Sequence, residues 1–165
     1  MPGTLMASEM AEQPAVLGRL IHAREELQAG VRALLPNAPV RIVIVARGSS
    51  DHAAVFGRYV LEHAARTPVA LAAPSLHTRY RVPTDYTGTL AVAVSQSGHT
   101  PEIVDALEAM RAGGARTLAV INDESSPLAG AADHAIALGA GAERAIPATK
   151  TFSAQLAVFA LLAEA

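Results

Sequence analysis

The sequence predicts an α/β fold, a doubly wound αβα sandwich around a five-stranded parallel sheet. Apolar runs recur along the 165 residues, at 40–46, 69–73, 90–94, 116–121 and 134–138. Strands that are buried on both faces have this composition. Segments with helical spacing separate the runs, as the crossover connections of a parallel sheet require.

The first segments follow from local signals. Residues 1–8 are expected to be disordered, as chain termini commonly are. An apolar stripe at helical spacing predicts one helix from Pro14 to about Leu35. The prolines within 36–39 end that helix before the strand at 40–46.

The helix after the first strand is predicted to run to about Ala65, and Ser50 or Asp51 is expected to cap it. Four larger apolar side chains are expected to face inward from it: Val55, Phe56, Tyr59 and Val60. The short strand at 69–73 follows, and residues 75–81 are ambiguous. These assignments complete the first half of the sheet.

The second half repeats the pattern. Thr100 is predicted to cap the helix after the strand at 90–94, with Pro101 at its first position and Gly113 after its end. The strand at 116–121, a short helix at 127–132 and the strand at 134–138 come next. A glycine- and proline-containing loop then leads into a final helix, expected over 149–165.

Composition and charge exclude several classes of protein. The net charge is −2 and only 17% of residues are charged, so no basic face for nucleic acid is expected. The chain has no cysteine, which excludes disulfides and thiolate metal sites. No apolar run is long enough to cross a membrane and no export signal is evident, so we expect a cytoplasmic protein.

The loop at 95–100 is the strongest chemical signal. Ser95, Gln96, Ser97 and Thr100 bring three hydroxyls and an amide to a strand-to-helix junction. A helix N-terminus offers unpaired N–H groups and the positive end of the helix dipole, which suit a phosphate. The alternative is an ordinary polar turn with a threonine cap, and the residues alone leave both interpretations open.

A second hydroxyl turn, Gly48-Ser49-Ser50, follows the first strand. It has one glycine where a dinucleotide-binding loop needs three, and no Gly-Lys-Ser/Thr motif occurs in the chain, so neither a nicotinamide cofactor nor a nucleoside triphosphate is favoured. The six histidines show no metal-binding spacing. We expect no cofactor and no metal.

Two charged residues near the final helix are catalytic candidates. Lys150 is the only lysine, and an ammonium there could neutralise a phosphate or act as a nucleophile. Glu143 lies in the loop before it and could act as a base. The alternatives are an exposed surface lysine and a solvated loop carboxylate.

Four segments, in this order, resemble the sugar isomerase (SIS) domain family. They are 9–14, 46–50, 95–100 and 143–152. The chain is most similar to the first SIS half of the isomerase module of glutamine–fructose-6-phosphate aminotransferase and of related amino-sugar phosphate deaminases/isomerases. The resemblance covers 9–165, which we expect to form a single SIS domain, and it implies a five-stranded parallel sheet with a sugar-phosphate ligand.

The resemblance also implies the roles of individual residues. The family's Ser-Gln-Ser-Gly-x-Thr loop holds phosphate, and its Gly-Thr-Ser turn and the loop before its Thr-Lys motif contact the ligand. The implied binding residues here are Gly48, Ser49, Ser50, Ser95, Gln96, Ser97, Thr100, Ile146 and Ala148. Ala148 stands where the aminotransferase has serine, which favours the deaminase/isomerase branch.

The implied function is binding of a hexose or amino-sugar 6-phosphate and a part in aldose–ketose isomerisation, deamination or both. In the family a second SIS domain carries the catalytic base, so we expect this chain to be the first half of a two-SIS protein or to pair as a homodimer. A non-catalytic sugar-phosphate sensor is the alternative. A defective fragment that binds poorly is the third interpretation.

Overall fold

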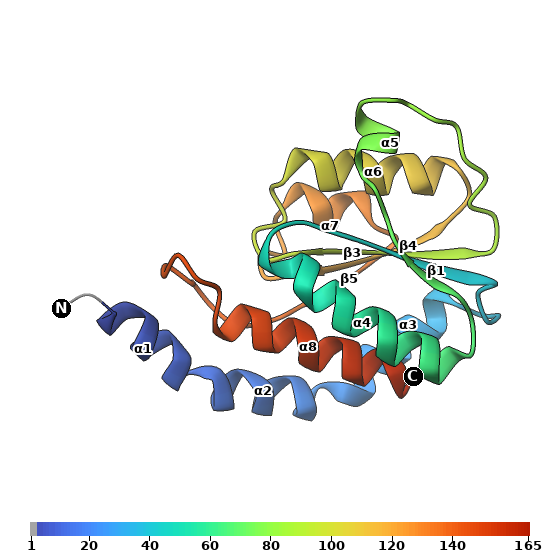
Figure 1. Ribbon diagram of the computed structural model, residues 1–165. Coiled ribbons are helices and arrows are strands. Elements are labelled where there is room, and N and C mark those ends of the chain that lie inside the picture. Colours follow the sequence, from blue (N-terminus) through green and yellow to red (C-terminus); the bar gives the residue numbers. More distant parts are fainter. Residues whose placement is uncertain (1–2) are drawn as a thin grey trace.

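The protein is a three-layer sandwich around one parallel sheet (Figure 1). The computed structural model describes residues 3–165. The strands are β1 (Arg41–Ala46), β2 (Val69–Leu71), β3 (Thr89–Ser95), β4 (Arg116–Ile121) and β5 (His134–Ala137). They pair in the order β2-β1-β3-β4-β5, all parallel, with Ala46 beside Val94 and Ser95 beside Ile121. The predicted fold class is confirmed.

Helices cover both faces of the sheet (Figure 1). One face carries α2 (Gln13–His22), α3 (Arg24–Leu34), α4 (Ser49–Ala65) and α8 (Lys150–Ala163). The other carries α6 (Pro101–Ala112) and α7 (Pro127–Ala131), and α5 (Ser75–Thr78) packs against α6. Alternate residues along β1 enter the two cores, Ile42 and Ile44 on one side and Val43 and Val45 on the other. This two-sided burial explains why the strands are continuously apolar.

The inward face of α4 differs from the prediction. Val55, Phe56 and Tyr59 are exposed, Tyr59 by 74%, and the buried face is made of small residues and Leu61. Close packing of α4 against α8 is the reason. The Phe159 ring of α8 lies where a Cβ on Gly57 would stand, and Ala53 and Ala54 are fully buried beside it.

The N-terminal region also differs from the prediction. The helix expected over residues 14–35 is two helices, α2 and α3, with a break at Ala23. The break lets α2 follow α8 while α3 turns beneath β5. Helix α1 (Thr4–Ala11) occupies most of the segment expected to be disordered, because Glu9 anchors it to a distant loop. Residues 1 and 2 lie outside the described residues.

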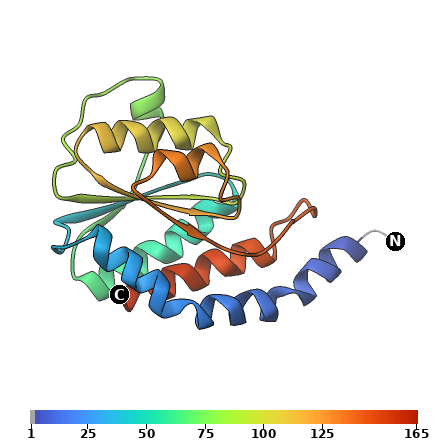
Figure 2. The same ribbon diagram turned by 180° about the vertical axis from the view of Figure 1, so that it is seen from behind.

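Helix α1 extends beyond the end of α8 and away from the sheet in both views (Figure 1, Figure 2). Among the described residues, no helix has the length and apolarity that a membrane crossing requires. Loops from several elements meet at one end of the sandwich, where β1 and β3 stop.

Substituting two helical glycines tests the packing of α4 on α8. Gly57→Ala places a Cβ 2.5 Å from the Phe159 ring, so we expect a loss of about 1–3 kcal/mol in unfolding free energy. Gly18→Ala, in α2, meets nothing within 4 Å and is the matched control, expected to gain about 0.5–1 kcal/mol. Urea unfolding of both variants measures the difference. Equal stabilities would contradict the packing.

Candidate functional site

A cleft of about 230 Å³ opens at the carboxyl ends of β1 and β3. Since β1 has β2 on one side and β3 on the other, its neighbours connect in opposite directions, and ligands in doubly wound folds bind at this switch point. Three segments far apart in the sequence form the cleft. Its lining residues are Arg47, Ser49, Ser50, Ser95, Gln96, Ser97, Thr100, Glu143, Ala145, Ile146, Ala148, Thr151 and Gln155.

The loop after β3 is held by its own serines. Ser95 Oγ accepts a hydrogen bond from the Gly98 N–H at 3.1 Å, and Ser97 Oγ accepts one from the His99 N–H at 3.3 Å. Gly98 has a φ of +67°, and a Cβ there would stand 2.1 Å from Ser126 Oγ, so only glycine fits. Both serine oxygens accept from the backbone, which leaves the hydroxyl hydrogens available to a ligand.

Thr100 stands at the N-cap position of α6 with an extended backbone, and Pro101 follows as predicted. Thr100 thus occupies the predicted cap position, but among the described residues its side chain makes no capping hydrogen bond. Its hydroxyl lines the cleft instead. The cleft therefore receives a free hydroxyl and the positive end of the α6 dipole together.

The turn after β1 places a second pair of hydroxyls. Gly48 has a φ of +62° and a ψ of −133°, which only glycine adopts readily, and it serves as the N-cap residue of α4. The predicted cap at Ser50 or Asp51 is therefore wrong, since both lie inside the helix. Ser50 is buried, and its Oγ accepts a hydrogen bond from Gln155 Nε2 at 3.0 Å.

Charges lie on the rim of the cleft and near the loop after β3. Arg47 makes a bidentate ion pair with Glu102 of α6, at 2.9 and 3.0 Å, and hydrogen bonding from Arg47 lowers the pKa of Glu102. His99 hydrogen-bonds Asp123 at 3.0 Å. The Ser125 hydroxyl, then His99, lower the pKa of Asp123 to about 2. Both basic side chains thus have acidic partners.

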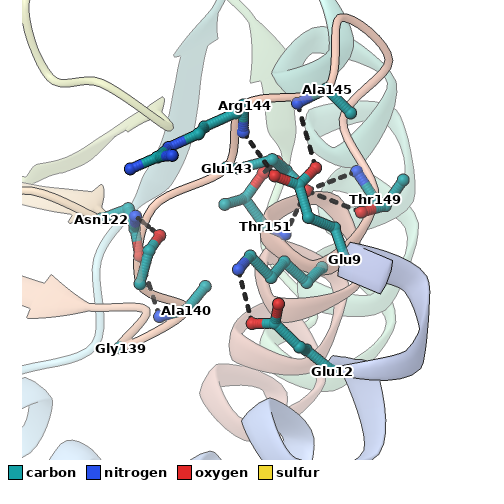
Figure 3. Close-up of polar contacts among 12 residues, drawn as sticks. Glu9, Glu12, Asn122, Gly139, Ala140, Glu143, Arg144, Ala145, Thr149 and Thr151 are labelled. Atoms are coloured by element: carbon teal, nitrogen blue, oxygen red, sulfur yellow. Dashed lines mark hydrogen bonds and ion pairs between the residues drawn. The ribbon is translucent and has the colours of Figure 1, made fainter. Parts of the chain in front are cut away.

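The third segment, residues 139–149, is tied down by side chains from elsewhere (Figure 3). Asn122 accepts from the Ala140 N–H at 2.9 Å and donates to the Gly141 carbonyl at 2.8 Å. The buried Glu9 carboxylate of α1 accepts from the N–H groups of Arg144 and Ala145, at 2.6 and 3.1 Å. The loop is thereby placed beside the cleft, with the Ile146 side chain exposed at its tip.

Glu143 closes the same loop onto the start of α8 (Figure 3). Its Oε1 accepts from the Thr149 N–H and hydroxyl, both at 2.8 Å, and its Oε2 accepts from the Thr151 hydroxyl. Burial raises the pKa of Glu143, but the hydrogen bonds from Thr151 and Thr149 outweigh burial, and the net pKa is lowered. Glu143 is therefore an ionised cap for α8 with its oxygens engaged.

Lys150 takes a different position from the one the sequence suggested. Its side chain is 3% exposed, and its Nζ lies 2.6 Å from Glu12 Oε2, between α8 and the N-terminal helices. It lies outside the set of described residues that line the cleft. The exposed surface lysine considered above is therefore wrong, whereas the catalytic role of Lys150 stays a prediction.

The structure brings together most of the residues that the sequence suggested. Every suggested binding residue except Gly48 lines the cleft, and Glu143 joins them; Gly48 supplies the turn. Four lining residues were missed: Arg47, Ala145, Thr151 and Gln155. Thr151 and Gln155 carried a usable signal, since they are polar, four residues apart and on one face of a mostly apolar helix. Within residues 3–165, no cluster of three or more histidine or acidic side chains is arranged to hold a metal.

Comparisons with known proteins agree with this geometry. The SIS domain family matches residues 34–165. Glutamine–fructose-6-phosphate aminotransferase [isomerizing] of Thermus thermophilus is 37% identical over 163 residues, which are 96% of this chain and 27% of that protein. The chain thus spans about a quarter of the length of such relatives.

Two solved structures also align with nearly the whole chain. A candidate phosphosugar isomerase from Silicibacter pomeroyi DSS-3 aligns with a TM-score of 0.90 and 37% identity, over 98% of this chain and 51% of that one. The C-terminal domain of glucosamine-fructose-6-phosphate aminotransferase from Francisella tularensis aligns with a TM-score of 0.83 and 28% identity, over 96% and 46%.

Glu143→Gln tests the capping role. At pH 7 we expect a loss of about 1–2 kcal/mol in unfolding free energy, limited by the partial exposure of the site. Because folding lowers the pKa of Glu143, its contribution is complete above the ordinary value of 4.5 and is lost as the pH falls through the folded-state pKa. The wild type and E143Q should therefore converge on acidification.

Urea unfolding at pH 7 and in mild acid measures this difference. Glu124→Gln, in an exposed loop, is the control and should match the wild type at both pH values. A constant gap between the wild type and E143Q at all pH values would contradict an ionised cap.

Proposed function

This chain belongs to the SIS domain family, and from that premise we propose that its cleft binds a hexose 6-phosphate or an amino-sugar 6-phosphate. The proposed binding residues are those suggested by the sequence: Gly48, Ser49, Ser50, Ser95, Gln96, Ser97, Thr100, Ile146 and Ala148. We further propose that the chain takes part in aldose–ketose isomerisation, deamination of amino-sugar phosphates, or both. The names of its relatives, which refer to fructose 6-phosphate and to isomerisation, support this substrate class.

One observation carries the proposal: the cleft offers several hydrogen-bond donors to a group that only accepts. The oxygens of Ser50, Ser95 and Ser97 already accept hydrogen bonds from protein N–H groups. Thr100, the N-cap residue of α6, lines the same cleft, so the N-terminus of α6 borders this space as well. A phosphate monoester is an acceptor-rich dianion, and such donors suit it without a dedicated cation.

A specific observation favours the second candidate function, sugar-phosphate binding without catalysis by this chain alone. A general base must reach the proton that it removes, with a free oxygen or nitrogen. Glu143 is occupied in capping α8, and Lys150 is buried against Glu12. The catalytic assignments of both residues stay predictions. In the structure, their contacts hold the start of α8 in place, through Thr149 and Thr151 for Glu143 and through Glu12 for Lys150.

A second SIS domain or a second copy of this chain is part of the proposal. Two observations support it. The solved relatives are about twice as long as this chain, which covers 51% and 46% of them. Helix α1 exposes Leu5, Met6 and Met10 on the end that extends beyond the sheet. A partner would then supply the missing base, and sedimentation of the chain with and without fructose 6-phosphate tests for pairing.

Ser97→Ala and Thr100→Ala should each weaken binding of fructose 6-phosphate by about 5- to 30-fold, or about 1–2 kcal/mol for one hydrogen bond to a charged group. Calorimetric titration measures both. Ser75→Ala and Thr78→Ala, on α5 outside the cleft lining, are the matched controls and should bind as the wild type does. Unchanged binding in both cleft variants would remove the phosphate assignment.

Turnover separates the two candidate functions. The chain is incubated with fructose 6-phosphate or glucosamine 6-phosphate, and interconversion and ammonia release are followed. Thermal stabilisation by either sugar without turnover, which the engaged Glu143 and Lys150 lead us to expect, would exclude catalysis by this chain alone. Turnover would exclude the sensor.

A further inference from the structure

We propose that Gln155 is a positioning residue, which orients the Ser50 hydroxyl so that it donates its hydrogen to an acceptor oxygen of the ligand. This inference rests on the proposed sugar-phosphate function and adds a residue that no sequence motif pointed to. Gln155 lies on α8, is 1% exposed and borders the cleft. Ser50, on the first turn of α4, is separated from it by 105 residues in sequence.

The direction of the hydrogen bond between them decides the chemistry. Gln155 Nε2 donates to Ser50 Oγ at 3.0 Å, so a lone pair of the hydroxyl oxygen is used inside the protein. The hydroxyl hydrogen is then free to point into the cleft, where it can meet only an acceptor. A phosphoryl oxygen or a sugar carbonyl oxygen fits this requirement, whereas a donor such as an ammonium does not.

The amide oxygen of Gln155, Oε1, supports a role in orienting Ser50 rather than in packing. This oxygen is buried and, among residues 3–165, is the only buried side-chain oxygen or nitrogen without a hydrogen-bond partner. An unpaired buried acceptor destabilises a protein, so the amide is poorly explained as a packing residue. A methionine of similar size would fill the space without that cost. The amide is explained by what its Nε2 does to Ser50.

The neighbours of Gln155 fit this function. Thr151 stands one turn before it on α8, and its hydroxyl is committed to Glu143. Arg47 and Glu143 are the charged residues that border the same cleft, and both are already paired. Within the described cleft lining, Gln155 therefore supplies the side-chain N–H group that sets the orientation of Ser50.

Two variants of Gln155 test the proposal. Gln155→Met removes the donor and the unpaired oxygen together. Gln155→Glu, when ionised, accepts a hydrogen bond from Ser50 and turns the hydroxyl away from the ligand. We expect both to weaken fructose 6-phosphate binding by about 10-fold or more near pH 8, with Q155E the weaker binder. The melting temperature of Q155M should be equal to or higher than that of the wild type.

A pH series separates positioning from a merely structural role. Burial favours the protonated form of the introduced carboxyl, as does the ionised Glu143 on the same cleft, while Arg47 on that cleft is paired with Glu102. The protonated carboxyl can again donate to Ser50. Binding by Q155E, expressed relative to the wild type to remove titration of the phosphate itself, should recover as the pH is lowered from 8 to about 6. Q155M should show no such recovery.

The control and the failure outcomes complete the experiment. In the Ser50→Ala background, Gln155→Met should have no further effect on affinity, because the hydroxyl that it orients is absent. A parallel titration with inorganic phosphate identifies the acceptor: loss with both ligands indicates a phosphoryl oxygen, and loss with fructose 6-phosphate alone indicates a sugar oxygen. Wild-type affinity in Q155M and Q155E overturns the proposal, whereas absence of binding by the wild type overturns the proposed function.

Discussion

The contact between the Glu143 carboxylate and the first turn of α8 supports the rest of the site. The first N–H groups of a helix have no partners within it, and an acidic group from outside stabilises them. Glu143 does so for Thr149 and also binds the Thr151 hydroxyl, so the loop ends in one position. Helix α8 packs on α4, which carries Ser50, and it holds Gln155 one turn later. This carboxylate thus ties the loop at 139–149 to the helix that carries Gln155 and packs on α4.

The N-terminal helices reinforce this arrangement from outside the sandwich. Glu9 holds the N–H groups of Arg144 and Ala145, and Glu12 holds Lys150, across separations of more than 130 residues. With Glu9 on two of its N–H groups and Lys150 fixed just after its end, the loop at 139–149 loses much of its freedom before a ligand binds. The ordering cost of binding falls accordingly. The same Glu9 contacts explain why α1 is ordered although it reaches beyond the sheet.

Local signals were sufficient for the sheet and for the loops that line the candidate cleft, but not for contacts between distant segments. The strand at 116–121 and the loops after β1 and β3 were predicted correctly, because burial on both faces and hydroxyl-rich turns leave a pattern in consecutive residues. The side of α4 that faces inward was not, since the Phe159 ring against Gly57 decides it. The burial of Lys150 was not predicted either, because its partner Glu12 is 138 residues away.

Two kinds of departure from local rules lie beside the cleft, although positive φ angles also occur far from it, at Arg66 and Arg81 among others. Gly48 and Gly98 adopt positive φ angles beside the cleft, and Gln155 leaves a buried oxygen unpaired there. Each of these features lowers stability relative to a simpler alternative. The positive φ angles are therefore not specific to the cleft, whereas the one unpaired buried side-chain oxygen among residues 3–165 is that of Gln155, which lines it. Because that oxygen has no benefit for packing, it supports the proposal that Gln155 orients Ser50 toward an acceptor of a ligand.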